Sequence, residues 1–529
     1  MKKILFTLGL SLLILLLSAC PAETKTPLGF TIDNATVSII QGTSKTVSIA
    51  LLRDSGFTQA VELSIGALPA KVSSGGFIPA TVLGNTSKVK IDVGKTASIA
   101  TTDIQITATA GAITKTAILQ LTIAKPATIT VKGKLVDPYG IAVANAKVQI
   151  LGRPIVSTNA QGQFLITNVK TPYDLIAINP RASMAVMYQG LRRSDPRITA
   201  FSFVAAKFKL TKIKGKVDGG IGYPEPAPYR SKIALESPDK LLTLTSTFST
   251  IHPQTGVYAQ TLVWLNKIPK VNIHALQWKD NSGVPSHFSG YGKKPGIDLI
   301  AGGNIENVNI TMAAVTEATF TAKIEIPNGY SLNNNKMSIN FGGNAEIEIA
   351  NNKSGNLNLF YITPQINGAS LTARAYALNK AGDVISKRLI NNLAVDSVGA
   401  KISLAQGSEL KLPLDKQTLV DNSTAFSWTQ FKNGIHAVFF ENADNKINFV
   451  ILTKNTTATI PDLSAFGITL PKDQQYSWHV VGLAPYASMD QVANTTNPFA
   501  IYIEEFTEFR GAPSGAMSDT DPREFKTAP

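Results

Sequence analysis

The chain is poor in cysteine, histidine and charge. Its 529 residues include one Cys and five His, and 16% of them are charged. A single cysteine excludes intrachain disulfides, and so few Cys and His residues argue against a Cys/His metal framework. The hydrophobic share of 44% excludes wholesale disorder, which requires low hydrophobicity and high net charge. The length predicts roughly three to five domains, each stable through its own core.

Motifs of common enzyme classes are also lacking. The sequence has no Gly-x-Ser-x-Gly, His-x-x-Glu or His-Glu-x-x-His pattern. Gly94-Lys95-Thr96 matches only the end of a phosphate-binding loop and lies between expected strands, so we interpret it as a turn. Ser237-Pro238-Asp239-Lys240 has a Ser-x-x-Lys spacing, but Pro238 argues against the helix that such a pair requires. We therefore predict no catalytic residues.

The histidines do not form a metal-binding pattern. His252, His274 and His287 are 22 and 13 positions apart, and these spacings match no common ligand set. His436 and His479 fall in expected strands, where we interpret them as packing residues. The sequence therefore predicts neither a metal site nor a cofactor.

The first twenty residues have the pattern of an export signal. Lys2 and Lys3 precede the apolar run Ile4–Leu17, which is too short for a transmembrane helix of about 20 residues. The segment Leu17-Ser18-Ala19-Cys20 that ends it resembles the lipobox of bacterial lipoproteins. The resemblance implies cleavage before Cys20, acylation of Cys20, and a short tether over residues 21–27. An ordinary secretory signal with a free Cys20 is the alternative.

The lipobox implies a location in the cell envelope. Acyl chains on Cys20 would hold the protein to a membrane, with the rest of the chain outside the cytoplasm. Pro21 is not the aspartate that retains such lipoproteins at the inner membrane of Gram-negative cells, which favours the outer membrane or the cell surface. No later segment has 18 uninterrupted apolar residues.

From residue 28 onward, the dominant pattern is the period-2 alternation of half-buried β-strands. Thr46–Leu51 and Leu119–Ile123 are examples, and Gly, Asn, Asp and Pro separate such segments. No amphipathic helix longer than two turns is expected. The predicted fold class is all-β, a string of about five β-sandwiches after the signal peptide.

The first two sandwiches resemble known modules. Residues 28–125 contain Gln41-Gly42, Val61-Glu62-Leu63-Ser64 and Leu68-Pro69, and resemble the Ig-like repeats of bacterial surface proteins. Residues 126–212 contain Val131–Asp137 and Thr158–Phe164, and resemble the carboxypeptidase regulatory-like (transthyretin-like) domain. The second resemblance implies a seven-stranded accessory or spacer sandwich without chemistry of its own.

Three further sandwiches are expected after residue 212. Ile213–Val217 repeats the opening of the previous unit 82 positions after Val131, which predicts a related sandwich over 213–313. Phe320–Ile324 opens another, over 314–407. Residues 408–509 resemble a fibronectin type III domain, in which Phe426-Ser427-Trp428 would be strand B, Val438–Phe440 strand C, Tyr476–Val480 strand F and Phe499–Ile503 strand G. Residues 510–529 are interpreted as a flexible tail.

Two aromatic and cationic stretches of the 213–313 unit form the candidate binding surface. Its residues are Tyr223, Tyr229, Arg230, Tyr291, Lys293 and Lys294. Aromatic faces stack on sugars, and cations bind phosphate or carboxylate, so the expected ligand is an anionic envelope polymer or polysaccharide. The alternative is that they are ordinary solvated loops. A third such stretch, in the second unit, contains Arg181, Tyr188, Arg192, Arg193 and Arg197.

The sequence therefore predicts a non-enzymatic, lipid-anchored cell-envelope protein that acts as an adhesion, scaffold or binding module. The alternative is an accessory or cryptic hydrolase of envelope or extracellular polysaccharide, which would need two carboxylates in one cleft. No specific nucleic-acid partner is expected, because the net charge of +14 is spread over all units.

The lipobox generates a direct prediction. Cys20→Ala removes the thiol that acylation requires, so the variant should leave the membrane fraction or remain an uncleaved precursor. Fractionation followed by intact-mass measurement checks this. Recovery of a mature-sized Cys20→Ala chain with the membranes would contradict the lipoprotein interpretation.

Overall fold

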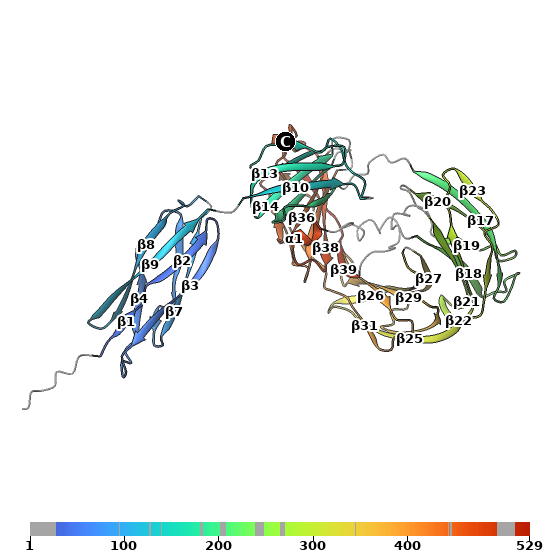
Figure 1. Cartoon of the computed structure of the whole chain (residues 1–529), viewed down its shortest axis with the longest axis horizontal. Helices are drawn as coiled ribbons and strands as arrows, with labels where there is room; N and C mark the ends of the chain where they lie inside the picture. Colours follow the sequence, from blue (N-terminus) through green and yellow to red (C-terminus); the bar gives the residue numbers. More distant parts are fainter. Residues whose placement is uncertain are drawn as a thin grey trace, which may run out of the picture. The chain divides into compact units, whose positions relative to one another are not determined.

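The computed structural model describes residues 28–529 except 95, 126–127, 139, 180–183, 201–207, 238–247, 265–269, 344, 443, 445–446 and 495–513. Strands β1 to β40 dominate these residues, together with a single-turn 3-10 helix (Ser464–Phe466) and a four-residue helix α1 (Met489–Val492) (Figure 1). The all-β fold class is confirmed. No helix in the described segments is long and apolar enough to cross a membrane. The chain divides into two compact units, one ending at Ala127 and the other beginning at Thr128.

The first unit is a sandwich of two sheets with the strand order of an immunoglobulin domain. One sheet has the order β1-β3-β7-β5 and the other β2-β9-β8-β4-β6, with β2 parallel to β9. Alternate side chains of both sheets, such as Val89, Ile106 and Leu119, fill the core between them. The strands are β1 (Phe30–Ile32), β2 (Ala35–Ile40), β3 (Ser44–Arg53), β4 (Val61–Ile65), β5 (Val72–Ile78), β6 (Thr81–Val82), β7 (Thr86–Val93), β8 (Thr101–Ala110) and β9 (Ile113–Ala124).

The second unit begins with three consecutive sandwiches that share one strand order. We name them sandwich A (residues 128–199), sandwich B (209–312) and sandwich C (316–403). One sheet of each has the order β13-β10-β16, β20-β17-β23 or β28-β25-β31, and in sandwich B β24 also pairs with β17. The strands of the other sheet have the order β12-β11-β14-β15, β19-β18-β21-β22 or β27-β26-β29-β30. In each sandwich the first strand pairs antiparallel with one neighbour and parallel with the C-terminal end of the sandwich, which is β16 in A, β23 and β24 in B, and β31 in C. Sandwiches B and C therefore repeat the architecture of sandwich A.

The strand bounds locate these repeats in the sequence. Sandwich A contains β10 (Thr128–Val136), β11 (Lys147–Ile150), β12 (Val156–Ser157), β13 (Gln163–Lys170), β14 (Tyr173–Asn179), β15 (Met184–Leu191) and β16 (Arg197–Thr199). Sandwich B contains β17 (Lys209–Gly219), β18 (Tyr229–Glu236), β19 (Phe248–Thr250), β20 (Val257–Trp264), β21 (Val271–Asn281), β22 (Val284–Ile297), β23 (Gly303–Ile305) and β24 (Ile310–Met312). Sandwich C contains β25 (Thr316–Glu325), β26 (Tyr330–Asn340), β27 (Glu346–Asn352), β28 (Asn358–Gln365), β29 (Ser370–Asn379), β30 (Val384–Leu393) and β31 (Ala400–Ser403). The expected boundary at 212/213 falls inside β17.

The last sandwich (residues 410–527) is named the fibronectin-like sandwich after the resemblance in its sequence, and it has strands at the positions predicted for B, C and F. They are β34 (Phe426–Trp428), β35 (Ile435–Glu441) and β38 (Gln475–Ala484). One sheet has the order β32-β34-β37, and in the other β35 lies between β36 and β38. The remaining strands are β32 (Leu410–Leu412), β33 (Gln417–Val420), β36 (Asn448–Thr453), β37 (Thr457–Ala458), β39 (Gly515–Thr520) and β40 (Arg523–Thr527).

The expected flexible tail over 510–529 is wrong from residue 515 onward. β39 and β40 both pair with β38, and Phe525 is fully buried in the core of the fibronectin-like sandwich. The sandwich therefore extends beyond the expected boundary at 509, while the predicted strand G at Phe499–Ile503 lies outside the described residues. The segment has few apolar residues, which suggested a loose tail. Backbone pairing with β38 and a few buried side chains are nevertheless enough to hold these strands in the sheet.

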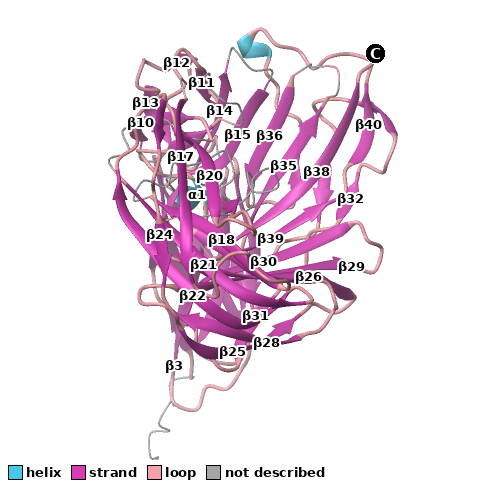
Figure 2. Ribbon diagram, turned by 90° about the vertical axis from the view of Figure 1, so that its right-hand side faces the viewer, coloured by secondary structure: helices cyan, strands magenta, loops and turns pink. Residues whose placement is uncertain are grey.

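The fibronectin-like sandwich joins sandwiches A and C edge to edge. β36 pairs parallel with β15, and β39 pairs antiparallel with β30. One continuous fourteen-stranded sheet results, and its central strands lie side by side in Figure 2. The expectation that every sandwich has a core of its own is therefore wrong for this part of the chain.

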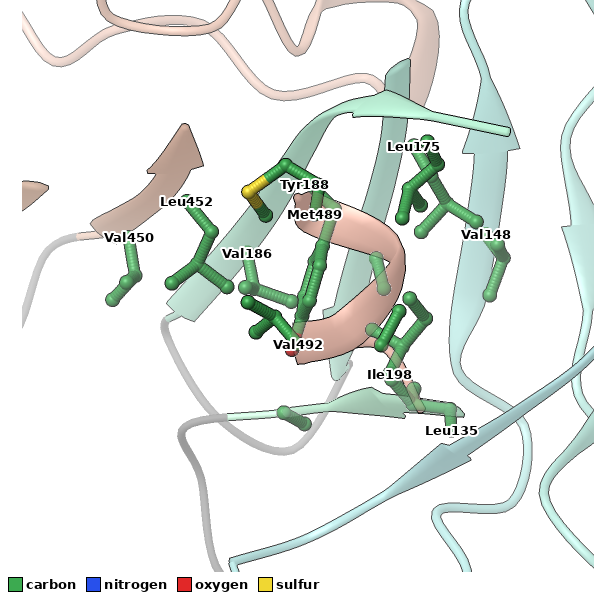
Figure 3. Packing of buried hydrophobic residues seen from close by; sticks show 14 of the residues in the cluster. Leu135, Val148, Leu175, Val186, Tyr188, Ile198, Val450, Leu452, Met489 and Val492 are labelled. Carbon is green, nitrogen blue, oxygen red and sulfur yellow. The ribbon is translucent and has the colours of Figure 1, made fainter. Parts of the chain in front are cut away.

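Side chains from different sandwiches fill common cores. Val186 and Tyr188 of β15 pack with Leu452 of β36 and with Met489 and Val492 of α1 (Figure 3). A second shared core joins sandwiches B and C, where Leu276, Trp278 and Phe288 of one sheet face are buried with residues of sandwich C such as Phe320, Met337 and Ile347. The side chains at these junctions are buried against residues far away in the sequence. The period-2 pattern of a single strand does not predict such contacts.

The shared core generates a stability prediction. Trp428 is buried in one cluster with Ile176 and Ile178 of β14 and Met187 of β15. Trp428→Ala should cost roughly 3–5 kcal/mol of unfolding free energy, as for other large core aromatics. Hydrogen exchange should rise in β14 and β15 as well as in β34, and stay unchanged in the first unit. A rise confined to residues 410–527 would contradict a shared core.

A buried histidine generates a pH prediction. Desolvation lowers the pKa of His436 to about 4, and its Nε2 accepts the Phe431 backbone N–H at 3.0 Å. An unfolded histidine has a pKa near 6.5, so between pH 6.5 and 4 the unfolded chain binds a proton at this residue that the folded protein does not bind. The unfolding free energy should therefore be highest above pH 6.5 and decrease by about 3 kcal/mol as the pH falls to 4. Denaturant unfolding of wild type and His436→Gln between pH 7 and 4 measures it. Equal pH slopes for the two proteins would contradict the prediction.

Candidate functional site

Five of the six residues of the candidate binding surface lie on the two faces of one sheet, and the sixth, Tyr223, lies in the loop before β18. Tyr229 and Arg230 begin β18, while Tyr291, Lys293 and Lys294 lie in β22, with β21 between the two strands. Neighbouring positions of a strand point to opposite faces, so Tyr229 and Arg230 separate, as do Lys293 and Lys294. The stretch around Tyr291 is strand rather than loop, whereas the stretch from 222 to 228 is a loop that ends where β18 begins. The structure does not bring the six side chains into one patch.

Two of these tyrosines are engaged within the protein. The Tyr223 hydroxyl donates to Ser231 Oγ at 3.1 Å, and its ring packs against the core of sandwich B. The Tyr291 hydroxyl lies 2.9 Å from Nδ1 of His274, and its ring stacks on Phe341 with centroids 5.5 Å apart. Burial raises the pKa of both tyrosines to about 12. Much of their surface is therefore committed to intramolecular contacts.

Two of the cations are paired. Arg230 forms an ion pair with Asp280 at 2.9 Å, and Lys293 with Glu236 at 3.1 Å. Glu236 also accepts from Asn272 at 2.7 Å and lies 3.0 Å from Nε2 of the buried His274. A ligand would have to displace these partners, which weakens this surface as a binding site.

A groove of about 760 Å³ lies instead on the three-stranded sheet of sandwich A. Its lining combines cations, polar side chains and apolar surface. The lining residues are Lys132, Gly133, Lys134, Val156, Ser157, Asn159, Gln163, Phe164, Leu165, Asp195, Pro196 and Arg197.

The strand register concentrates positive charge in this groove. Lys132 and Lys134 are two residues apart on β10 and share its outer face, and Arg197 of β16 is the in-register neighbour of Lys134. Within the described part of the chain, none of the three side chains forms a hydrogen bond or ion pair, and Arg197 Nε is buried without a partner. The lining contains one carboxylate, Asp195, which is held by Arg193 at 2.8 Å. The groove therefore favours an anion.

Local packing explains why the sequence builds this surface. Gly133 pairs with Phe164 of β13, and a Cβ at Gly133 would collide with the Phe164 ring. Only glycine lets the ring lie beneath β10. Asn159 Oδ1 accepts the backbone N–H groups of Gln161 and Gln163, at 3.0 and 2.8 Å, and so shapes the turn that leads into β13.

The fibronectin-like sandwich positions the other side of the groove. The Arg197 backbone N–H donates to the Ala493 carbonyl at 2.7 Å, directly after α1. Arg193 donates to the Asp490 carbonyl at 2.9 Å and to Asn494 Oδ1 at 3.0 Å. Burial lowers the pKa of the Arg197 guanidinium. Segments nearly 300 positions apart thus fix one end of the cationic surface.

Sequence reasoning found only part of this groove. Arg197 belonged to the arginine-rich stretch, of which Arg181 lies outside the described residues and Tyr188 is fully buried, its hydroxyl accepting the Thr199 N–H at 3.1 Å. Lys132 and Lys134 are part of the Val131–Asp137 strand motif and do not belong to the candidate binding surface predicted from sequence. The available signal was their i, i+2 spacing, which places both on the solvent face of that strand.

Metal-ligating side chains do not gather in the described residues: no three His, Cys, Asp or Glu side chains there are placed to hold an ion. His274 contacts Tyr291 and Glu236, and Nδ1 of His287 lies 3.0 Å from Glu317 Oε1. His436 and His479 are both buried, and His479 stacks on Phe439 with centroids 4.8 Å apart, which agrees with their interpretation as packing residues.

No protein-family model and no curated protein matches this sequence. Among solved structures, domains 5–6 of the S-layer protein SbsC are 13% identical, with 52% of this chain and 99% of that chain covered and a TM-score of 0.15. Titin domains z1z2 in complex with telethonin are 10% identical, with 52% and 95% covered and a TM-score of 0.14. A Streptococcal ancillary pilin is 8% identical, with 53% and 98% covered and a TM-score of 0.13. Scores this low carry no argument about function, so the site must be judged by its own geometry.

Proposed function

We propose that this chain is a non-enzymatic, lipid-anchored envelope protein that binds an anionic polysaccharide in the groove of sandwich A. The observation that carries the proposal is a set of three cations, Lys132, Lys134 and Arg197, on adjacent positions of one sheet face, whose side chains have no partner among the described residues. An incoming phosphate or carboxylate gains charge-assisted hydrogen bonds there without displacing an internal partner. The guanidinium of Arg197 can bind either group through two parallel hydrogen bonds.

The rest of the lining suits a sugar polymer. The Ser157 hydroxyl and the Gln163 side-chain N–H groups can donate to sugar hydroxyl oxygens, while Asn159 holds the turn and the Gln163 Oε1 from within. Leu165, which is 54% exposed, offers an apolar surface. A site that combines cations, amides and a small apolar patch favours a uronate- or phosphate-bearing polysaccharide over a neutral one. The partner class is therefore an anionic polymer of the envelope or its surroundings.

The adhesion or scaffold role follows from combining this groove with the proposed anchor. Acyl chains on Cys20 would hold one end of the protein at a membrane, preferably the outer membrane or the cell surface, and residues 21–27 would act as a tether. Cys20 lies outside the described residues. The rival hydrolase function has less support, because the groove lining contains a single carboxylate where polysaccharide hydrolysis commonly uses two.

The decisive experiment compares two surfaces by removing the same charge from each. Lys132→Ala/Lys134→Ala/Arg197→Ala empties the groove of cations, and Arg230→Ala/Lys293→Ala/Lys294→Ala does the same for the surface predicted from sequence. Both variants of the mature chain are titrated with polygalacturonate, a carboxylated polysaccharide. The groove variant should bind at least about tenfold more weakly, a loss of about 1.4 kcal/mol, while the second variant should stay close to wild type.

Salt and charge controls complete the test. Binding should weaken as ionic strength rises from about 0.01 to 0.15 M, since the Debye length falls from about 30 to 8 Å, and neutral dextran should not bind. Equal losses in the two variants would indicate bulk charge alone and contradict the groove. A loss confined to the Arg230, Lys293 and Lys294 variant would assign binding to that other surface.

A further inference from the structure

Sandwich B repeats the strand that supplies the lysines of the groove. β10 and β17 are the first strands of their sandwiches and hold the same place in the two sheet orders. Both carry a Lys-Gly-Lys segment, Lys132-Gly133-Lys134 in β10 and Lys214-Gly215-Lys216 in β17. The repeat therefore preserves a cationic sequence at one structural position.

The packing beneath the two glycines is also repeated. Gly133 is in register with Phe164, and Gly215 is in register with Tyr258. A Cβ at Gly215 would collide with the Val308 carbonyl and approach the Tyr258 hydroxyl to 2.9 Å, as a Cβ at Gly133 would collide with Phe164. In both sandwiches the missing side chain leaves room for groups on the inner face, the Phe164 ring at Gly133 and the Val308 carbonyl with the Tyr258 hydroxyl at Gly215. The flanking lysines point outward.

The outer face of β17 forms a straight row of cations. Lys212, Lys214 and Lys216 alternate with buried residues and follow one another at about 6.6 Å, twice the rise of a strand residue. The side chains of Lys212 and Lys214 form no hydrogen bond or ion pair within the described residues. Lys216 pairs with Asp218 at 2.7 Å, but both side chains are about half exposed, and such surface pairs are weak. The row therefore presents accessible positive charge.

We propose that this row on β17 is a second binding site for the same class of polyanion, so that one extended polymer bridges sandwiches A and B. The inference rests on the proposed function of the groove and adds a site to it. Charge complementarity selects the occupant, since regularly spaced cations fit a chain with an anionic group on successive units. A flat row of this kind holds a polymer along its length rather than a small molecule.

Chain connectivity limits the distance between the two sites. Arg197 and Lys212 are fifteen residues apart in sequence, so their Cα atoms lie no more than about 54 Å apart, however the sandwiches are oriented. A polymer longer than this can occupy both sites at once. Once the polymer is bound at one site, it meets the second site at a high effective concentration, so the overall affinity exceeds that of either site alone.

The test uses the whole mature chain and two lengths of one ligand. Wild type should bind two equivalents of an oligogalacturonate a few sugars long, and long polygalacturonate should bind at least about tenfold more tightly than the oligomer. Lys214→Ala/Lys216→Ala should bind one equivalent of the oligomer and lose the gain in affinity for the long polymer. Isothermal titration calorimetry reports both stoichiometry and affinity.

The first unit supplies a matched control. Lys88, Lys90 and Asp92 of β7 repeat the spacing of Lys214, Lys216 and Asp218, including an ion pair at 2.8 Å, but Thr86 stands where the row on β17 has Lys212, so β7 carries two lysines in line instead of three. Lys88→Ala/Lys90→Ala should leave both measurements unchanged, and an equal loss in this control would overturn the second site. If wild type binds one equivalent of the oligomer, and only the groove variant loses it, the second site is overturned while the proposed function of the groove stands. Failure of wild type to bind either length would contradict both.

Discussion

Two strand pairs at the edges of the fibronectin-like sandwich hold the large unit of this protein together. β36 pairs with β15 of sandwich A, and β39 pairs with β30 of sandwich C. An unpaired sheet edge exposes backbone N–H and C=O groups that invite pairing with another chain. Here those groups are satisfied within one molecule, and the paired edges bring buried side chains of different sandwiches into common cores. A string of modules thereby becomes one sheet with shared stability.

The proposed binding groove depends on the same constraint. β16, which carries Arg197, is held by the Ala493 carbonyl, and Arg193 beside it is held by Asp490 and Asn494 of the fibronectin-like sandwich. These contacts fix cationic groups before a ligand arrives, and a ligand that meets a preorganised site loses less of its binding energy to ordering the protein. The shape of the groove in sandwich A therefore depends on the folding of the C-terminal sandwich.

The structure gives different roles to lysines of similar appearance in the sequence. Lys293 is paired with Glu236 and lies beside the buried His274, so it belongs to an internal polar cluster at the junction of sandwiches B and C. Lys132 and Lys134 have no internal partner in the described residues and face outward on β10. The difference arises from the carboxylates that neighbouring strands supply. A count of cations and aromatic residues along the chain does not contain that information.

The sequence by itself determined the all-β class, the immunoglobulin-like first sandwich and the core strands at Phe426–Trp428 and Tyr476–Val480, because alternation of apolar side chains is a local property of each strand. The repeated Lys-Gly-Lys segment likewise indicated that sandwich B is related to sandwich A. Only the tertiary structure decided that Gly515–Thr520 and Arg523–Thr527 are strands, that sandwiches share cores, and that Tyr223 and Tyr291 are engaged internally. Edge pairing and burial between sandwiches join residues far apart in the chain, and no local pattern encodes them.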